Sequence, residues 1–242
     1  MNDAPANRIR ITAVLVLLVI LQVIFVAVRM TTTIRAQDAV PSAPSLDAFE
    51  FPTPDMALTI QSGAERGNQV ATAWSSDAVL TFASMQIDWP IEPPPATVTS
   101  VSPFGWIRLM YVAPIDDGPS DYAALSLMFE RVTGKLADVR VSRWDVSPQS
   151  GNLLDGVTVT DETAVLAAEV DKGTVYRTAC PAKRNESIIS ITRDPATGEP
   201  IWSVSYDENG RNSSGSMLIN VNAVSGALTE IRLGPPTCAG QG

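Results

Sequence analysis

An unbroken apolar run near the N-terminus is the feature that most restricts how this chain can fold. Residues 11–28 read ITAVLVLLVILQVIFVAV and contain no charged side chain. At about 1.5 Å rise per residue, a helix of this length with its flanks approaches the roughly 30 Å thickness of a bilayer's hydrocarbon core. The run therefore predicts a transmembrane helix over residues 11–30, with membrane lipid as its partner through residues 11–28.

A cleaved secretory signal is the alternative for this run, because Arg8 and Arg10 form a basic segment in front of it. Signal peptides have apolar segments of about 7 to 15 residues, whereas this run is longer and is followed at once by Arg29. We therefore expect an uncleaved anchor, although Arg29 and Arg35 nearly balance the positive-inside bias. Residues 1–10 are predicted to be cytoplasmic and the C-terminal region extracytoplasmic, either periplasmic or at the cell surface, which describes a single-pass membrane protein.

The only two cysteines, Cys180 and Cys238, are too far apart in the sequence for a C-x-x-C metal or redox motif. Their number fits a structural disulfide in an oxidising compartment. Closing so long a loop would stabilise the fold by about 4 kcal/mol. Two buried, reduced thiols are the alternative.

The remaining composition argues against several classes of function. Beyond Arg35 the chain has 25 acidic and 13 basic side chains, a balance that repels phosphate backbones, so no nucleic-acid partner is expected. The chain has no histidine, which excludes histidine-dependent catalysis and histidine-ligated metals. It also lacks a phosphate-binding loop and a dinucleotide-binding glycine motif. We therefore predict a protein that is not an enzyme, with no cofactor, no metal and no catalytic residues.

Proline-rich stretches divide the chain into segments. Residues 31–56 combine proline with alanine, serine and threonine, a composition typical of an extended linker. Apolar residues recur with near-helical spacing over residues 64–85 and predict a helix there. A second proline-rich stretch, residues 89–103, predicts a long surface loop. Two folded units are expected, at residues 57–147 and 148–242.

Seven later segments are rich in β-branched, aromatic and alternating apolar residues, and they predict strands. These segments are residues 106–113, 123–131, 136–141, 188–192, 201–206, 217–221 and 228–233. A further helix is expected over residues 161–172, with Thr160 as its N-cap and Gly173 placed to end it.

Two strand-turn-strand segments match each other when the sequence is shifted by 92 residues. The shift places apolar residues on apolar residues and one glycine on another, which favours a tight turn with positive φ in both segments. The matched pairs are Leu127 and Ile219, Phe129 and Val221, Val132 and Val224, Gly134 and Gly226, Leu136 and Leu228, Val139 and Ile231, and Arg140 and Arg232. The pattern predicts an internal duplication. The alternative is that any two β-hairpins look alike at this level.

Particular residues in both halves carry a family resemblance. They are residues 73–80 (AWSSDAVL) and Trp106 in the first half, and residues 200–206 (PIWSVSY) and 219–228 (INVNAVSGAL) in the second. These segments resemble the PepSY-like family of small extracytoplasmic α+β modules, over about two thirds of the chain. Asn222 stands where the family usually has aspartate.

The resemblance implies an α+β fold: a single N-terminal transmembrane helix followed by two tandem PepSY-like units, each a helix packed on an antiparallel sheet. Family members occur in peptidase propeptides and cell-envelope proteins, where they bind or restrain a partner. The function implied is a membrane-anchored, extracytoplasmic interaction module, an accessory or assembly subunit of a membrane complex with other membrane-complex or envelope proteins as partners. Inhibition or regulation of an envelope peptidase is the alternative.

Aromatic and proline side chains outside the periodic apolar faces are the candidates for partner contact. They are Trp89, Pro93, Pro94 and Pro95 in the proline-rich loop, and Trp144 in the connection between the halves. Exposed aromatic residues favour interfaces. Local packing is the alternative for both tryptophans.

Two competing functions belong to other classes. A carboxylate-dependent hydrolase would need paired carboxyl groups, for which the chain offers Asp116 with Asp117 and Asp207 with Glu208. Both pairs lie in turn-like stretches, where solvated acidic residues are expected. A small-ligand or lipid-binding protein would need a deep apolar cleft between sheet and helices.

Overall fold

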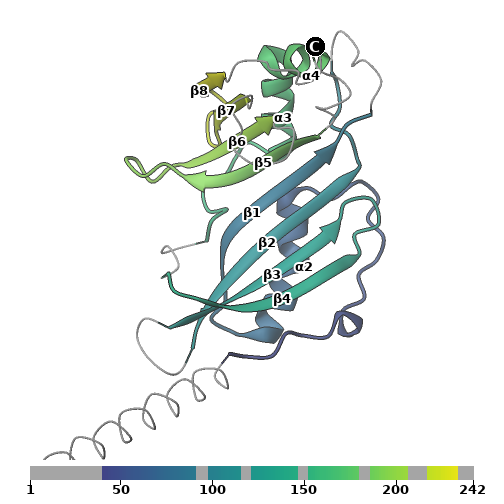
Figure 1. The fold of residues 1–242 in the computed structure, drawn as a ribbon, viewed down its shortest axis with the longest axis vertical. Helices are drawn as coiled ribbons and strands as arrows, with labels where there is room; N and C mark the ends of the chain where they lie inside the picture. Colours follow the sequence, from purple (N-terminus) through teal and green to yellow (C-terminus); the bar gives the residue numbers. More distant parts are fainter. Residues whose placement is uncertain are drawn as a thin grey trace, which may run out of the picture.

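Eight antiparallel strands form one continuous sheet in the computed structural model, in the order β4-β3-β2-β1-β5-β6-β7-β8 (Figure 1). The structure describes residues 40–90, 98–115, 121–146, 152–179, 186–206 and 217–233. The strands are β1 (Val79–Asp88), β2 (Gly105–Pro114), β3 (Tyr122–Glu130), β4 (Leu136–Trp144), β5 (Glu186–Arg193), β6 (Pro200–Tyr206), β7 (Met217–Asn222) and β8 (Leu228–Leu233). The seven segments expected to be strands are confirmed, and β1 is an eighth that the sequence pattern did not indicate.

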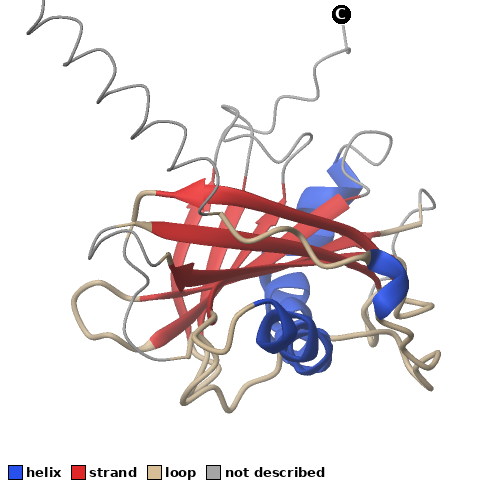
Figure 2. Ribbon diagram, turned by 90° about the horizontal axis from the view of Figure 1, so that it is seen from below, coloured by secondary structure: helices blue, strands red, loops and turns tan. Residues whose placement is uncertain are grey.

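Two helices pack on the same face of this sheet (Figure 2). α2 (Ile60–Trp74) contacts β1, β2 and β3, whereas α3 (Asp161–Ala168) contacts β6 and β7. A short 3-10 turn, η1 (Leu46–Ala48), precedes α2 and contacts β4. α3 continues through a π-helical turn, η2 (Glu169–Gly173), into α4 (Thr174–Ala179).

The core lies between the sheet and these helices, and the two-residue period of the strands builds it. In β6, Trp202, Val204 and Tyr206 are fully buried, while the residues between them are half-buried. Successive side chains of a strand point to opposite faces, so one face of β6 meets α3 and the other does not. β7 follows the same alternation. Burying this face supplies the main driving force for folding.

The prediction of one helix over residues 64–85 is wrong, because α2 begins earlier and ends at Trp74. Thr59 caps the first turn: its hydroxyl accepts the Ser62 N–H at 3.2 Å, and the Ser62 hydroxyl accepts the Thr59 N–H at 2.9 Å. After Trp74 the chain turns and enters β1, which pairs with β2 on one side and β5 on the other. The apolar residues of β1 fit a strand as well as a helix, and pairing partners distant in the sequence decide between the two.

The second helix begins where the sequence indicates but does not end there. The Thr160 hydroxyl accepts the Thr163 N–H at 3.2 Å, which confirms the predicted N-cap. Gly173 does not end the helix but lies in the π-helical turn that leads into α4. A Cβ atom on Gly173 would lie 2.2 Å from the Tyr206 hydroxyl oxygen. The close approach of the helix to the sheet therefore requires a glycine at position 173. Ending the helix is not its role.

The β3–β4 and β7–β8 hairpins are equivalent, which confirms the match between segments 92 residues apart. Both have the same register and a bulge at the same place in the strand after the turn. Gly134 and Gly226 occupy the same turn position, with φ of 67° and 75°. The equivalent pairs are Leu127 with Val139 and Phe129 with Leu136 in the first hairpin, and Ile219 with Ile231 and Val221 with Leu228 in the second.

The predicted fold class, two PepSY-like units that each pack a helix on an antiparallel sheet of their own, is wrong. β1 and β5 pair along six residues, from Ala83 with Ile191 to Asp88 with Glu186. The two four-stranded meanders therefore form one sheet, and the described chain is mostly β-structure. Apolar periodicity shows which side chains face a core, but it does not show which strand edges hydrogen-bond to each other. The sequence pattern therefore predicted two separate sheets instead of one.

The prediction of a single-pass membrane protein is also corrected. Among the residues that the structure describes, no helix has the length and apolar character needed to cross a bilayer. The apolar run at residues 11–28, on which that prediction depended, lies outside the described residues.

Candidate functional site

A groove of about 820 Å³ lies between the segment before α2 and the β3–β4 hairpin, and we call it the hairpin groove. One wall comes from η1 and the five residues after it. The other wall comes from the hairpin turn and the adjoining ends of β2, β3 and β4. The lining residues are Leu46, Asp47, Phe49, Glu50, Phe51, Thr53, Trp106, Glu130, Thr133, Lys135, Leu136 and Ala137.

Arg66 of α2 fastens the two walls of the hairpin groove together. Its guanidinium donates to the Gly134 carbonyl at 3.0 Å and to the Pro52 carbonyl at 2.8 Å. The guanidinium carbon Cζ lies 5.4 Å from the centroid of the Phe51 ring. Phe51 in turn packs edge-on against Phe129, with ring centroids 5.7 Å apart. The segment before α2 is therefore packed against the hairpin and does not extend freely.

The lining of the hairpin groove combines aromatic rings with acidic groups. Phe49 and Phe51 are stacked, with ring centroids 6.4 Å apart and planes 10° apart. Leu46 is 42% exposed and adds an aliphatic side chain to the lining. Three carboxylates lie in the lining, and Lys135 is its one cationic side chain. Such a surface can bind a partner through apolar contact and charge, and it offers no arrangement for covalent chemistry.

The corresponding segment of the second half packs more closely on its own hairpin. The Thr158 hydroxyl donates to the Val224 carbonyl, and the Val159 N–H donates to the Ala223 carbonyl at 2.9 Å. The Trp202 indole N–H donates to the Val159 carbonyl at 2.8 Å. The second half therefore fastens this segment to its hairpin by direct hydrogen bonds, whereas the first half uses the Arg66 side chain.

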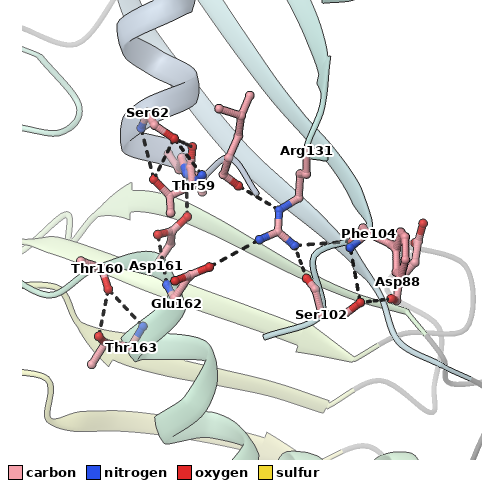
Figure 3. Close-up of polar contacts among 12 residues, drawn as sticks. Thr59, Ser62, Asp88, Ser102, Phe104, Arg131, Thr160, Asp161, Glu162 and Thr163 are labelled. Atoms are coloured by element: carbon pink, nitrogen blue, oxygen red, sulfur yellow. Dashed lines mark hydrogen bonds and ion pairs between the residues drawn. The ribbon is translucent and has the colours of Figure 1, made fainter. Parts of the chain in front are cut away.

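A second cluster, of polar and charged side chains, lies where the first turns of α2 and α3 meet (Figure 3). Arg131 is completely buried there. Its guanidinium donates to the Leu58 carbonyl at 2.9 Å and to the Ser102 carbonyl, and it lies 3.6 Å from the Glu162 carboxylate. Burial lowers the pKa of Arg131, and the carboxylates of Asp161, Glu162 and Asp88 act in the opposite direction.

Asp161 joins the two helices of this cluster. One of its oxygens accepts the Ile60 N–H of α2 at 2.6 Å, and the other accepts the Glu162 N–H at 3.0 Å. Burial raises the pKa of Asp161 to about 6, although both hydrogen bonds lower it. Because the Ile60 N–H is one of the unpaired donors at the start of a helix, this bond satisfies it across the fold. The cluster holds the two helix ends together.

A buried ion pair occupies the π-helical turn. The Arg177 guanidinium binds the Glu169 carboxylate at 2.8 Å and lies 4.1 Å from the centroid of the Trp89 ring. The Trp89 indole N–H donates to the Ser187 hydroxyl at 2.8 Å. These contacts tie α4 to the loop after β1 and to β5.

The structure places the predicted contact residues as follows. Trp89 is 6% exposed and makes the internal contacts just described, and Trp144 is half-buried at the end of β4. The remaining candidates lie outside the described residues: Pro93, Pro94, Pro95, Cys180, Cys238, Asp116, Asp117, Asp207 and Glu208. A partner interface and a disulfide at these positions stay predictions. Within the described ranges, no group of three or more potential metal-ligating residues occurs.

Sequence reasoning missed the hairpin groove. Phe49 and Phe51 lie in the proline-rich stretch that composition assigned to an extended linker. Two aromatic residues separated by a single residue were the available signal, since aromatic side chains in a true spacer have nothing to pack against.

No family model and no curated protein matches the chain. Among solved structures, the chain is similar to a "putative lipoprotein" from Clostridium difficile 630, with 11% sequence identity and a TM-score of 0.40 over 74% of this chain and 95% of that one. At that identity and TM-score, the similarity assigns neither a fold family nor a function to this chain.

Proposed function

We propose that the chain is a protein-interaction module, an accessory or assembly subunit of a larger complex, and that it holds its partner in the hairpin groove. The observation that carries the proposal is the groove's lining of half-buried aromatic rings and exposed polar groups on a rigid frame. Buried aromatic anchors surrounded by a polar rim are the usual composition of a protein interface.

Three features of the frame support this use. The Arg66 hydrogen bonds and the packing of Phe51 on Phe129 hold the groove open in one shape. A preformed site loses less conformational entropy on binding than a mobile one. The volume of about 820 Å³ lies in the range of roughly 300 to 1,000 Å³ that is common for binding sites. A short stretch of a partner chain fits such a space.

Site-specific photocrosslinking tests the proposal. A photoreactive amino acid is placed in the full chain at Thr53 or at Ala137, both exposed in the hairpin groove, or at Asp77, an exposed residue in the turn before β1. In the cells that naturally express the chain, we expect the same partner to crosslink at both groove positions and not at Asp77.

A groove-filling substitution provides the second arm. In the Thr53 crosslinking variant, Ala137→Trp is expected to abolish the partner crosslink while leaving the thermal unfolding midpoint nearly unchanged, because Ala137 is exposed. Purified partner must then bind the unmodified chain and fail to bind Ala137→Trp. Crosslinks that are equally strong at Asp77, or that survive Ala137→Trp, would contradict the proposal.

A further inference from the structure

We propose that the hairpin groove selects an extended, positively charged segment of its partner. This inference rests on the proposed function, because it names the chemistry of the partner at the same site. It depends on the charges of the lining, the aromatic faces that lie beside them and the shape of the walls.

The charges of the lining are unbalanced. Asp47, Glu50 and Glu130 contribute three carboxylates, against the single ammonium of Lys135. Asp47 and Glu50 are exposed, and Glu130 is half-buried, with one oxygen accepting the Thr133 hydroxyl at 2.6 Å. The whole chain also carries a formal net charge of -9, so its long-range field attracts cations toward the groove. A cationic partner segment complements this lining, and an anionic one is repelled.

The aromatic residues of the lining suit the same partner. A lysine or arginine side chain has an apolar stem and a charged end, and it can lie along a ring while its charge meets a carboxylate. Phe51 already holds the Arg66 guanidinium at 5.4 Å from its ring centroid. Phe49 is stacked beside it, and Trp106 lies in the opposite wall. The carboxylates of Asp47, Glu50 and Glu130 belong to the same lining as these rings, so a cation bound in the groove can pair with them.

The walls favour an extended chain over a helix. One wall includes the non-helical stretch from Phe49 to Thr53, and the other includes the start of β4, an edge strand of the sheet. Ala137 is the bulged residue in the pairing of β3 with β4, so the ladder is interrupted at the groove. A strand-like partner segment can lie alongside these two stretches of extended backbone, with its successive side chains pointing alternately to either side.

Binding of defined peptides to the full chain in non-ionic detergent tests the inference. The probe is an acetylated and amidated heptapeptide of alternating threonine and lysine, and the matched control replaces every lysine with glutamate. We expect the lysine peptide to bind at least tenfold more tightly at low salt, and to lose affinity as salt is raised. Equal binding of the two peptides would overturn the inference.

Charge variants locate the effect. The triple variant Asp47→Asn, Glu50→Gln, Glu130→Gln is expected to weaken binding of the lysine peptide about tenfold. Each lost pair between a carboxylate and a peptide lysine is expected to lower the affinity by a factor of about two to three. A matched triple variant, Asp55→Asn, Glu65→Gln, Asp77→Asn, makes the same change in net charge at exposed residues outside the groove lining, and it is expected to bind within twofold of the unmodified chain. An equal loss in both triple variants would overturn the inference, since net charge alone would then explain it.

Lys135→Gln gives a result that a folding defect cannot imitate. Removing the one cation of the lining is expected to tighten binding of the lysine peptide about threefold, and a weaker or unchanged affinity would count against the inference. The proposed function is judged separately by the partner crosslink at Thr53. If that crosslink persists in the groove triple variant, the charge inference fails and the proposed function stands. If the unmodified chain gives no groove crosslink, both fail.

Discussion

The carboxyl group of Asp161 lies buried where α2 and α3 begin, and burial raises its pKa from 3.8 to about 6. The folded state therefore binds the proton of this group more tightly than the unfolded state does. A raised pKa contributes stability that is fully present below pH 3.8 and is lost as the pH rises through about 6. Over that window the free energy of unfolding changes by about 3 kcal/mol on account of this one group.

Replacing Asp161 with asparagine is expected to remove this pH dependence. Asparagine keeps an oxygen that can accept the Ile60 N–H but has no proton to lose. Urea unfolding at several pH values between 4 and 7 measures the effect: the unmodified chain is expected to lose about 2 kcal/mol more than Asp161→Asn across this range. The exposed Asp77→Asn is the control. Parallel pH profiles for the unmodified chain and Asp161→Asn would refute the assignment.

Arg131 is expected to be among the most sensitive positions in the chain. Truncation to alanine leaves the Leu58 and Ser102 carbonyls without their donor, and it removes the positive charge beside the buried Asp161 and the half-buried Glu162. Such a loss costs about 3 to 5 kcal/mol of unfolding free energy. Arg140→Ala is the matched control, because the Arg140 side chain is 78% exposed and its ion pair with Asp138 contributes less than about 1 kcal/mol. Chemical denaturation compares the two, and similar losses would contradict this account.

At the scale of elements, a glycine in each helical segment allows a close approach to the sheet, and each of these glycines faces a tyrosine hydroxyl. Gly67 of α2 faces Tyr111 of β2, and Gly173 of η2 faces Tyr206 of β6. Tyr111 and Tyr206 occupy equivalent positions, because each pairs with the strand that begins the equivalent hairpin. Burial raises the pKa of both phenols, so both are neutral in the folded chain. The duplicated plan therefore extends from the hairpins to the contact between helix and sheet.

Gly173→Ala is expected to destabilise the chain by about 1 to 3 kcal/mol, although alanine is the better helix former. The added methyl would lie 2.2 Å from the Tyr206 hydroxyl oxygen. Removing that hydroxyl in Gly173→Ala, Tyr206→Phe is expected to restore only part of the loss, because the ring carbon Cζ would still lie 2.6 Å from the added methyl. Thermal unfolding of the single and double variants measures the difference. Lys172→Ala, at an exposed neighbouring position, is the control. A double variant no more stable than Gly173→Ala would show that the contact is not the cause.

At the scale of the whole molecule, the pairing of β1 with β5 makes one sheet of two meanders. Ser84 and Ser190 lie opposite each other in this pairing, and they are equivalent positions of the two halves. Outward from that pair, both halves follow chain order to the edge strands β4 and β8. This arrangement is an approximate two-fold relation. The contact between Asp161 and the Ile60 N–H joins the two helices near the same seam.

A shared sheet predicts that the two halves unfold as one cooperative unit. Amide hydrogen exchange is expected to give the same free energy of opening for the slowest amides of β2 and β6. Ile189→Ala, at a fully buried position of the seam, is expected to lower both values together by about 2 to 4 kcal/mol. Leu218→Ala, at a half-buried position of β7, is expected to lower them much less. Protection lost in one half alone would mean that the halves are independent.

The sequence by itself determined the local features of this fold. The strands of both hairpins, their glycine turns and the Thr160 cap all follow from residues within a few positions of one another, where side-chain period and backbone preference act directly. The same local information was ambiguous at β1, where apolar residues fit a helix and a strand alike.

Only the tertiary structure decided which strand edges pair, and with that the joining of two meanders into one sheet. It also decided that Phe49 and Phe51 line a groove and that Arg131 and Asp161 share a buried joint. These features depend on contacts between residues far apart in the chain, such as Ile60 with Asp161. A periodic pattern records that a side chain is buried but not what buries it, because burial depends on the area removed from water and not on which residue covers it.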